Sequence, residues 1–217
     1  MTVTVNTATP DATKIAGTKT VADWKALCAK LDTAPTRELW AKAYDEFFLA
    51  RLESRYFSPI RTLEKNPAHL GEGFAIVAIL CSLVEFLEST FQGKTYRYKR
   101  KKDPALTEHE YGESGKIFAA FLVNRTPFKS VFDQPLAEDF YANVRCGLLH
   151  EARSKGGWLI RTGKDTDPMI DAARKIIFRK SLQKGFDDLL KYYRAQLLTD
   201  NALQDAFKRR MNSLCLE

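Results

Sequence analysis

The segment of residues 73–91 constrains the fold more than any other, because it is the most apolar stretch of the chain. Its large apolar side chains are Phe74, Ile76, Val77, Ile79, Leu80, Leu83, Val84, Phe86 and Leu87. At about 100° per residue, these side chains surround a helix on nearly all sides. A helix that is apolar all round belongs in the core of a protein. The segment therefore predicts a central helix covered by other helices.

Helical periodicity continues through most of the remaining sequence. It covers residues 21–31, 36–65, 116–123 and 136–152, a stretch from about 174 or 180 to 198, and residues 201–211. Thr36 fits the N-cap of the second of these helices, and Pro59 is expected to kink or interrupt that helix. We therefore predict an all-α fold, a helical bundle.

Two parts of the chain depart from the helical pattern. Residues 1–20 are Thr-rich with few large apolar side chains, so we expect a flexible N-terminal tail. Residues 158–161 fit a short strand, with 169–170 or 176–178 as candidate partners, so a small β-hairpin is one option for this region. Residues 21–217 then form a single helical domain.

The composition bounds the function without choosing it. Hydrophobic residues make up 45% of the chain, which is enough for a sizeable core, and the net charge is +7. A basic surplus suits a nucleic acid or an anionic membrane surface as partner, and it equally suits a solvated surface.

Neither a metal nor a cofactor is expected. The four cysteines lie far apart in the sequence, and His69 and His109 lie in loops without metal-ligand partners. Thiols in apolar helical patterns fit a reducing compartment, and the N-terminus lacks a basic-then-apolar signal sequence. The apolar run of residues 74–84 is too short to cross a bilayer. We therefore expect a cytoplasmic protein without a membrane partner.

Residues 94–102 form a basic loop, in which six of nine residues are Lys or Arg and none is acidic. The candidate RNA contacts are Lys94, Tyr96, Arg97, Tyr98, Lys99, Arg100, Lys101 and Lys102. Lys and Arg neutralise phosphates, while aromatic rings stack on unpaired bases. The alternative is a solvated loop whose two tyrosines pack back on the core.

Two carboxylates, Glu85 and Glu88, lie within the predicted central helix. A buried carboxylate requires a partner. In one interpretation Glu88 is solvated and Glu85 bonds a nearby Arg, Tyr or Trp. In the other, Glu85 has a supporting functional role and orients Arg145 or His150.

The helix of residues 136–152, here called the motif helix, carries two apolar stripes. The core stripe consists of Leu136, Ala137, Phe140, Val144 and Leu148. A second, smaller stripe of Ala142, Cys146 and Leu149 lies between Arg145 and His150, which are about 140° apart on the wheel. A helix with two apolar stripes usually contacts its own core and a partner. The second stripe therefore predicts a homodimer interface.

An Arg, four residues and then a His, late in a small all-helical domain, resemble the HEPN family. Its ribonuclease members carry an Arg followed by four to six residues and a His. Residues 143–150 match the shortest form of that motif, with Asn143 as a supporting residue. The family often has a polar residue directly after the Arg, where this chain has Cys146.

The resemblance implies an HEPN-like helical bundle and a metal-free endoribonuclease with a composite site at a homodimer interface. It implies RNA as substrate and a role as a toxin or antiviral-defence effector. A minimal nucleotidyltransferase antitoxin, or another regulatory partner, is then expected. The family also has non-catalytic members that bind RNA or protein.

The chemistry of the two motif residues fits cleavage through the 2′-hydroxyl of RNA. His150, near the C-terminal end of its helix, suits a general acid, because the helix dipole favours the imidazolium. Arg145 can hold two phosphate oxygens. Residues five apart on a helix point in different directions, so two chains are needed to complete one site. A Cys146–His150 nucleophile pair is the weaker alternative, because no third group orients it.

Overall fold

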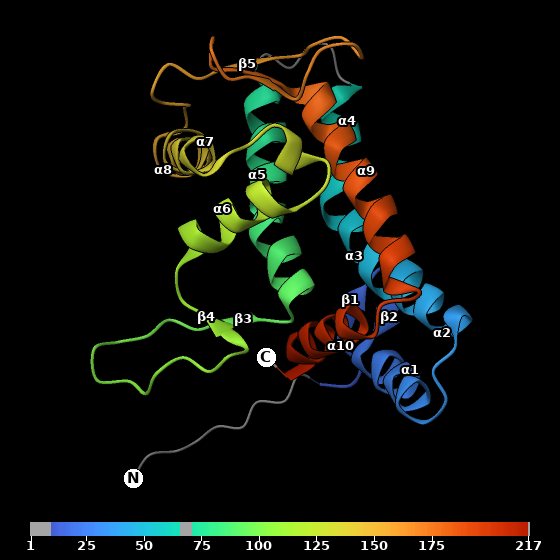
Figure 1. The fold of residues 1–217 in the computed structure, drawn as a ribbon. Coiled ribbons are helices and arrows are strands. Elements are labelled where there is room, and N and C mark those ends of the chain that lie inside the picture. Colours follow the sequence, from blue (N-terminus) through green and yellow to red (C-terminus); the bar gives the residue numbers. More distant parts are fainter. Residues whose placement is uncertain (1–9, 66–70, 217) are drawn as a thin grey trace.

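The computed structural model describes residues 10–65 and 71–216, and these form a mainly helical fold (Figure 1). Its centre is α5 (Glu72–Gln92), as predicted. The helices packed against it are α4 (Ser58–Glu64), α6 (Ser114–Asn124), α9 (Arg179–Leu197) and α10 (Asn201–Leu216). Ile76, Val77 and Leu80 are fully buried beneath them.

The central helix is not covered on every side. Ala75 and Ser82 are exposed on one face, and 42% of Phe74 is exposed. By length and apolar content α5 also meets the criteria for a membrane-spanning helix, which the core helices of soluble proteins often meet as well. The sequence analysis considered only the apolar run of residues 74–84, which is too short to cross a bilayer. The whole helix, at 21 residues, is long enough.

A single long helix precedes the central one, and it includes two π-helical segments. Its parts are α2 (Arg37–Lys42), η1 (Ala43–Leu49), α3 (Ala50–Leu52), η2 (Glu53–Phe57) and α4. Thr36 caps it, as predicted, by accepting a hydrogen bond from the Leu39 backbone N–H at 3.3 Å. The predicted interruption at Pro59 is wrong, because Phe57 and Ser58 keep right-handed helical dihedrals. The wider turn of η2 just before Pro59 leaves room for the ring.

The start of the chain corrects the prediction of a flexible tail through residue 20. Strands β1 (Lys14–Ala16) and β2 (Lys19–Thr20) pair antiparallel, and Ile15 is 3% exposed. Thr20 then caps α1 (Val21–Thr33). The isoleucine anchors the hairpin on the core, which the Thr-rich composition does not indicate. Residues 1–9 of the predicted tail lie outside the described residues.

The motif helix has a π-helical segment at its centre. Its parts are α7 (Gln134–Phe140), η4 (Tyr141–Arg145) and α8 (Cys146–Glu151). A short 3-10 turn, η3 (Phe128–Ser130), connects it to α6. Phe140 and Val144 of the predicted core stripe are buried, while Leu148 is only partly covered.

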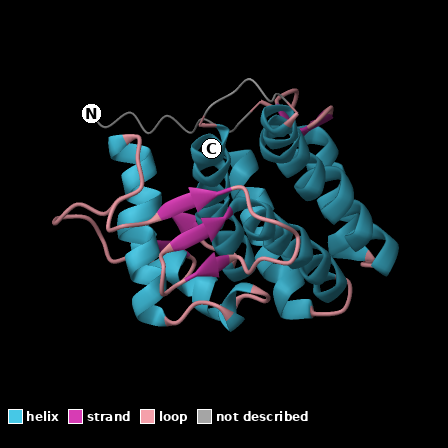
Figure 2. Cartoon of the chain, turned by 90° about the horizontal axis from the view of Figure 1, so that it is seen from above, coloured by secondary structure: helices cyan, strands magenta, loops and turns pink. Residues whose placement is uncertain are grey.

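Small sheets complete the described fold. Strand β7 (Ile176–Phe178) pairs antiparallel with β6 (Ile170–Asp171) and parallel with β5 (Leu159–Arg161). The strand predicted at residues 158–161 forms as β5 and pairs with 176–178, one of its two candidate partners, but in parallel and so not as a hairpin. The antiparallel pair is β6 with β7, which was not predicted. This sheet lies across the ends of the helices (Figure 2). Farther along α5, β3 (Thr95–Tyr96) pairs in parallel with β4 (Glu110–Tyr111) at the base of the basic loop.

Candidate active site

The motif helix is fixed to its own chain on one side by Val144 and Gly147. Val144 is fully buried. A Cβ on Gly147 would lie 2.5 Å from the Arg153 backbone oxygen, so glycine is required where the turn after α8 folds back. Gly147 therefore packs against its own chain.

The Arg145 guanidinium points toward the central helix. Its Nη2 lies 4.0 Å from Glu85 Oε2, at the outer limit of an ion pair. Its Cζ lies 5.4 Å from the centre of the Tyr141 ring, and Nη1 donates to Cys146 Sγ across 3.9 Å. Only 22% of the side chain is exposed. Arg145 is therefore held in place by neighbours from its own chain.

Glu85 links Arg145 to the base of the basic loop. Its Oε1 accepts hydrogen bonds from the Tyr111 hydroxyl at 3.0 Å and from Ser114 Oγ at 2.9 Å. Burial, reinforced by the Glu85 charge, raises the pKa of Tyr111, so the hydroxyl remains a donor at neutral pH. The contacts agree with both interpretations of Glu85, as a partner of Tyr or Arg and as a neighbour that orients Arg145.

Sequence reasoning did not find Tyr111 and Ser114. They lie 26 and 29 residues from Glu85, and no periodic pattern connects positions in three different elements. The one available signal was a carboxylate on the apolar central helix, which required donors without indicating which ones.

His150 lies in the last turn of α8 and is exposed. Its imidazole makes no hydrogen bond or ion pair with any residue in the described ranges 10–65 and 71–216. Arg145 turns toward α5 while His150 faces solvent. One chain therefore does not bring the two motif residues together, in agreement with the angle expected from the helical wheel.

The second apolar stripe is open to solvent. Ala142 is exposed, Leu149 is 62% exposed, and Cys146 is half-buried. Behind Cys146 lies Cys81 of α5, whose thiol pKa is raised to about 12 by burial. Leu149 is the most exposed of the large aliphatic residues that the structure describes. The stripe has the accessibility that a dimer interface requires.

Asn143, which was predicted to support the site, instead forms hydrogen bonds that hold the motif helix to the following turn. Its Nδ2 donates to Asp139 Oδ1 at 2.8 Å, and its backbone oxygen accepts from the Lys155 N–H at 2.7 Å. Gly156, at φ +58°, lies directly against its side chain. Asn143 therefore joins the motif helix to the turn that follows it, and it does not point toward Arg145.

The basic loop extends away from the helices (Figure 1). Lys99, Arg100, Lys101 and Lys102 are exposed and form no ion pair with a described residue. The loop therefore offers four charges close together for an anionic partner.

The two tyrosines and the arginine of the loop differ in accessibility. Tyr98 is 70% exposed, so the alternative in which it packs on the core is wrong, whereas Tyr96 lies with its ring 5.5 Å from Tyr111. Arg97 is tied up within the loop, because its Nε donates to Glu110 Oε1 at 2.7 Å. Its Nη2 also donates to the Ala105 carbonyl at 2.8 Å. Arg97 thus shapes the loop and is a poor candidate for RNA contact.

Glu88 corrects the expectation of a solvated carboxylate. It is 1% exposed, and Arg125 donates to both of its oxygens, at 2.7 and 2.8 Å. Gln92 donates to it as well, at 2.6 Å. The complete pairing explains how a charge is accommodated on the central helix.

Residues 10–65 and 71–216 contain no group of three His, Cys, Asp or Glu side chains able to hold a metal ion, and His69 lies outside those ranges.

In comparisons with known proteins, the chain matches no protein family, no curated protein and no solved structure.

Proposed function

We propose that this protein is an HEPN-type, metal-independent endoribonuclease that acts as a homodimer. Arg145 and His150 from two chains would line one cleft, with RNA held by the basic loop. Arg145 would bind the scissile phosphate. The 2′-oxygen would attack phosphorus and lose its proton to the neutral His150 of one chain. The bond from phosphorus to the 5′-oxygen would break, and the protonated His150 of the other chain would donate a proton to that oxygen. The products are a 2′,3′-cyclic phosphate and a 5′-hydroxyl end.

One observation carries this proposal. Arg145 and His150 border an apolar stripe in which Leu149 is 62% exposed. A second copy bound to that stripe would bring Arg145 and His150 of one chain close to the same two residues of the other, because a two-fold contact is self-complementary. Within one chain the same two residues remain apart.

The proposal places the protein in the cytoplasm as a toxin or antiviral-defence effector without a membrane partner. A free ribonuclease is harmful to its host, so a minimal nucleotidyltransferase antitoxin or another regulatory partner would restrain it. The basic loop, with four exposed cations and Tyr98, supports RNA over a neutral substrate.

RNA cleavage in EDTA tests the proposal. The wild-type protein should cut RNA and leave cyclic phosphate ends, and His150→Ala and Arg145→Ala should each be at least about a hundredfold slower. His109→Ala is the matched control, because this histidine is also exposed but lies just before β4, outside the motif helix. Cleavage by His150→Ala at the wild-type rate would rule out the assignment.

A second candidate is a non-catalytic HEPN-like module that binds RNA or protein. Its support is that Arg145 is already engaged by Glu85, Tyr141 and Cys146 within its own chain. In that case the wild-type protein leaves RNA intact in the same assay. Retention of labelled RNA on the uncut protein indicates an RNA-binding module, and loss of both cleavage and binding indicates a protein scaffold.

A further inference from the structure

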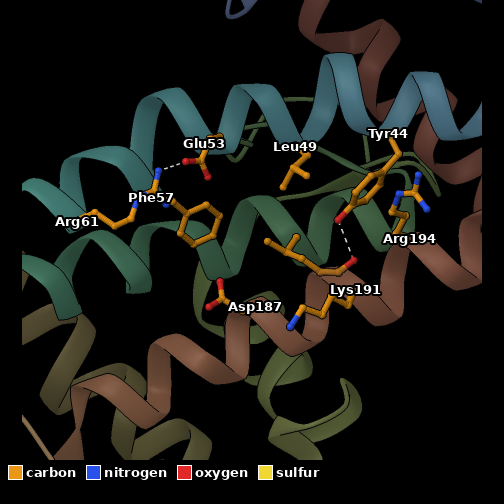
Figure 3. A pocket seen from close by; sticks show the side chains of 9 residues that line it. Tyr44, Leu49, Glu53, Phe57, Arg61, Asp187, Lys191 and Arg194 are labelled. Atoms are coloured by element: carbon orange, nitrogen blue, oxygen red, sulfur yellow. Dashed lines mark hydrogen bonds and ion pairs between the residues drawn. The ribbon is translucent and has the colours of Figure 1, made fainter.

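A pocket of about 270 Å³ lies between α9 and the long helix that contains η1 and η2, on elements apart from the motif helix (Figure 3). Its apolar walls are Tyr44, Leu49, Phe57 and Leu190. The Tyr44 hydroxyl donates to the Leu190 backbone oxygen at 2.8 Å and so closes one end. The volume suits a ligand with a short hydrocarbon body.

Both π-helical segments of the long helix contribute to this pocket. Tyr44 and Leu49 belong to η1, and Glu53 and Phe57 belong to η2. A π-helical turn is wider than an α-helical one and is frequent at functional sites. The two wide turns set the lining residues that face α9.

Each cation that lines the pocket has a carboxylate partner. The pairs are Arg61–Glu53, Arg194–Asp45 at 2.6 Å and Lys191–Asp188 at 3.6 Å. The positive charges around the pocket are therefore already compensated by the protein.

Among the charged residues that line the pocket, Asp187 receives no hydrogen bond or ion pair from the described chain. Its exposed side chain points into the gap beneath Phe57 (Figure 3), and Lys191, Arg61 and Lys184 act on it only through their charges. This side of the pocket thus presents one carboxylate without a donor among the described residues.

We propose that this pocket binds a small organic ammonium, a primary amine on a short hydrocarbon chain. The ammonium would donate to Asp187 beside the Phe57 ring, and the hydrocarbon would lie between Leu49 and Leu190. A carboxylate next to an aromatic ring favours a cation over a neutral or anionic group. This site is separate from the proposed nuclease site and independent of that function.

Calorimetric titration at pH 7.5 with hexylamine, hexanol and hexanoate tests the proposal, because the three probes share one chain length and differ in charge. Hexylamine should bind with a dissociation constant on the order of millimolar, in keeping with its size. Asp187→Asn should weaken that binding at least about tenfold, the usual scale for a charge-assisted hydrogen bond. The control is Asp165→Asn, which removes the same charge at an exposed position that does not line the pocket and should bind hexylamine normally.

Leu49→Trp, which fills the pocket, gives a second test and should abolish hexylamine binding. Thermal melting of each variant without ligand verifies the fold. Equal or tighter binding of hexanoate, unchanged binding to Asp187→Asn or Leu49→Trp, or no binding of hexylamine would each overturn the proposal.

Discussion

At the scale of single residues, Asp139 shows how the motif helix is held in place. Its carboxylate accepts from Trp158 Nε1 at 2.7 Å, from Asn143 Nδ2 at 2.8 Å and from Lys175 Nζ at 3.3 Å. Burial opposes ionisation of this carboxyl, but the three donors together lower its pKa below the ordinary value. One carboxylate thus joins the motif helix to the turn and the sheet that follow it.

Asp139→Asn should lower the melting temperature at pH 7 by a few degrees. The amide of Asn has one acceptor oxygen where the carboxylate of Asp has two, so its NH₂ group would face one of the three donors. The negative charge opposite Lys175 would also be lost. A loss of about 1 kcal/mol corresponds to about 2–4 °C for a domain of this size. Melting curves from circular dichroism measure it.

The difference in melting temperature between the wild type and Asp139→Asn should shrink as the pH falls. Because the folded-state pKa of Asp139 is lowered, the ionised group stabilises the fold above its unfolded pKa of about 4, and this contribution disappears as the pH falls through the folded-state pKa. The two melting temperatures should therefore converge in strong acid. Asp165→Asn, at an exposed position, is the control and should melt like the wild type. A difference that grows on acidification would contradict this role.

At the scale of elements, periodicity predicted the helices but not the π-helical segments within them. The wheel assumes about 100° per residue, and a π-helical turn adds a residue without changing the apolar composition. Phe140 and Val144 are still buried as predicted, because residues four apart share a face in either geometry. Leu148, beyond η4, is only partly covered.

Contacts between distant segments were the other part that the sequence could not provide. Glu85 was identifiable as a carboxylate in need of a partner, but its donors Tyr111 and Ser114 belong to elements far along the chain. The exposed basic loop could be predicted from charge alone. The engagement of Arg97 by Glu110 could not, since both are ordinary surface residues in the sequence.

The basic loop yields a prediction at this scale. Reversal of its four exposed cations to Glu should weaken RNA binding and reduce the slope of log affinity against log salt by about 3, because each phosphate contact on a single strand contributes about 0.7. The altered residues are Lys99, Arg100, Lys101 and Lys102. Arg97 is left unchanged, since its bonds to Glu110 and to loop carbonyls maintain the loop. Filter binding over a salt series measures the effect.

A second variant with the same net charge separates local contact from the overall field. It reverses four exposed basic residues elsewhere that form no ion pair with described residues, namely Lys14, Lys30, Arg37 and Lys129. This control should keep most of the RNA affinity. Equal losses in both variants would mean that RNA responds to net charge and does not contact the loop.

At the scale of the whole molecule, the candidate functional features lie on different elements. The motif helix carries Arg145 and His150 on either side of an exposed apolar stripe, while the basic loop projects from the far end of α5 (Figure 1). Between the two, Glu85 accepts a hydrogen bond from Tyr111 at the base of the basic loop and lies 4.0 Å from Arg145 of the motif helix. A dimer through the motif helix would place two such loops on one assembly, which suits a long flexible substrate better than one loop does.

Leu149→Glu tests that assembly. Leu149 is 62% exposed in one chain, and a two-fold contact through it would place two like charges together in the variant. The wild type should be a dimer by light scattering, and the variant should shift toward monomer and lose RNA cleavage although Arg145 and His150 remain. Leu159→Glu is the matched control, because Leu159 is 47% exposed on strand β5, away from the motif helix, and its variant should stay dimeric and active. A wild-type monomer with full activity, or a Leu149→Glu monomer that cuts RNA at the normal rate, would exclude a composite site.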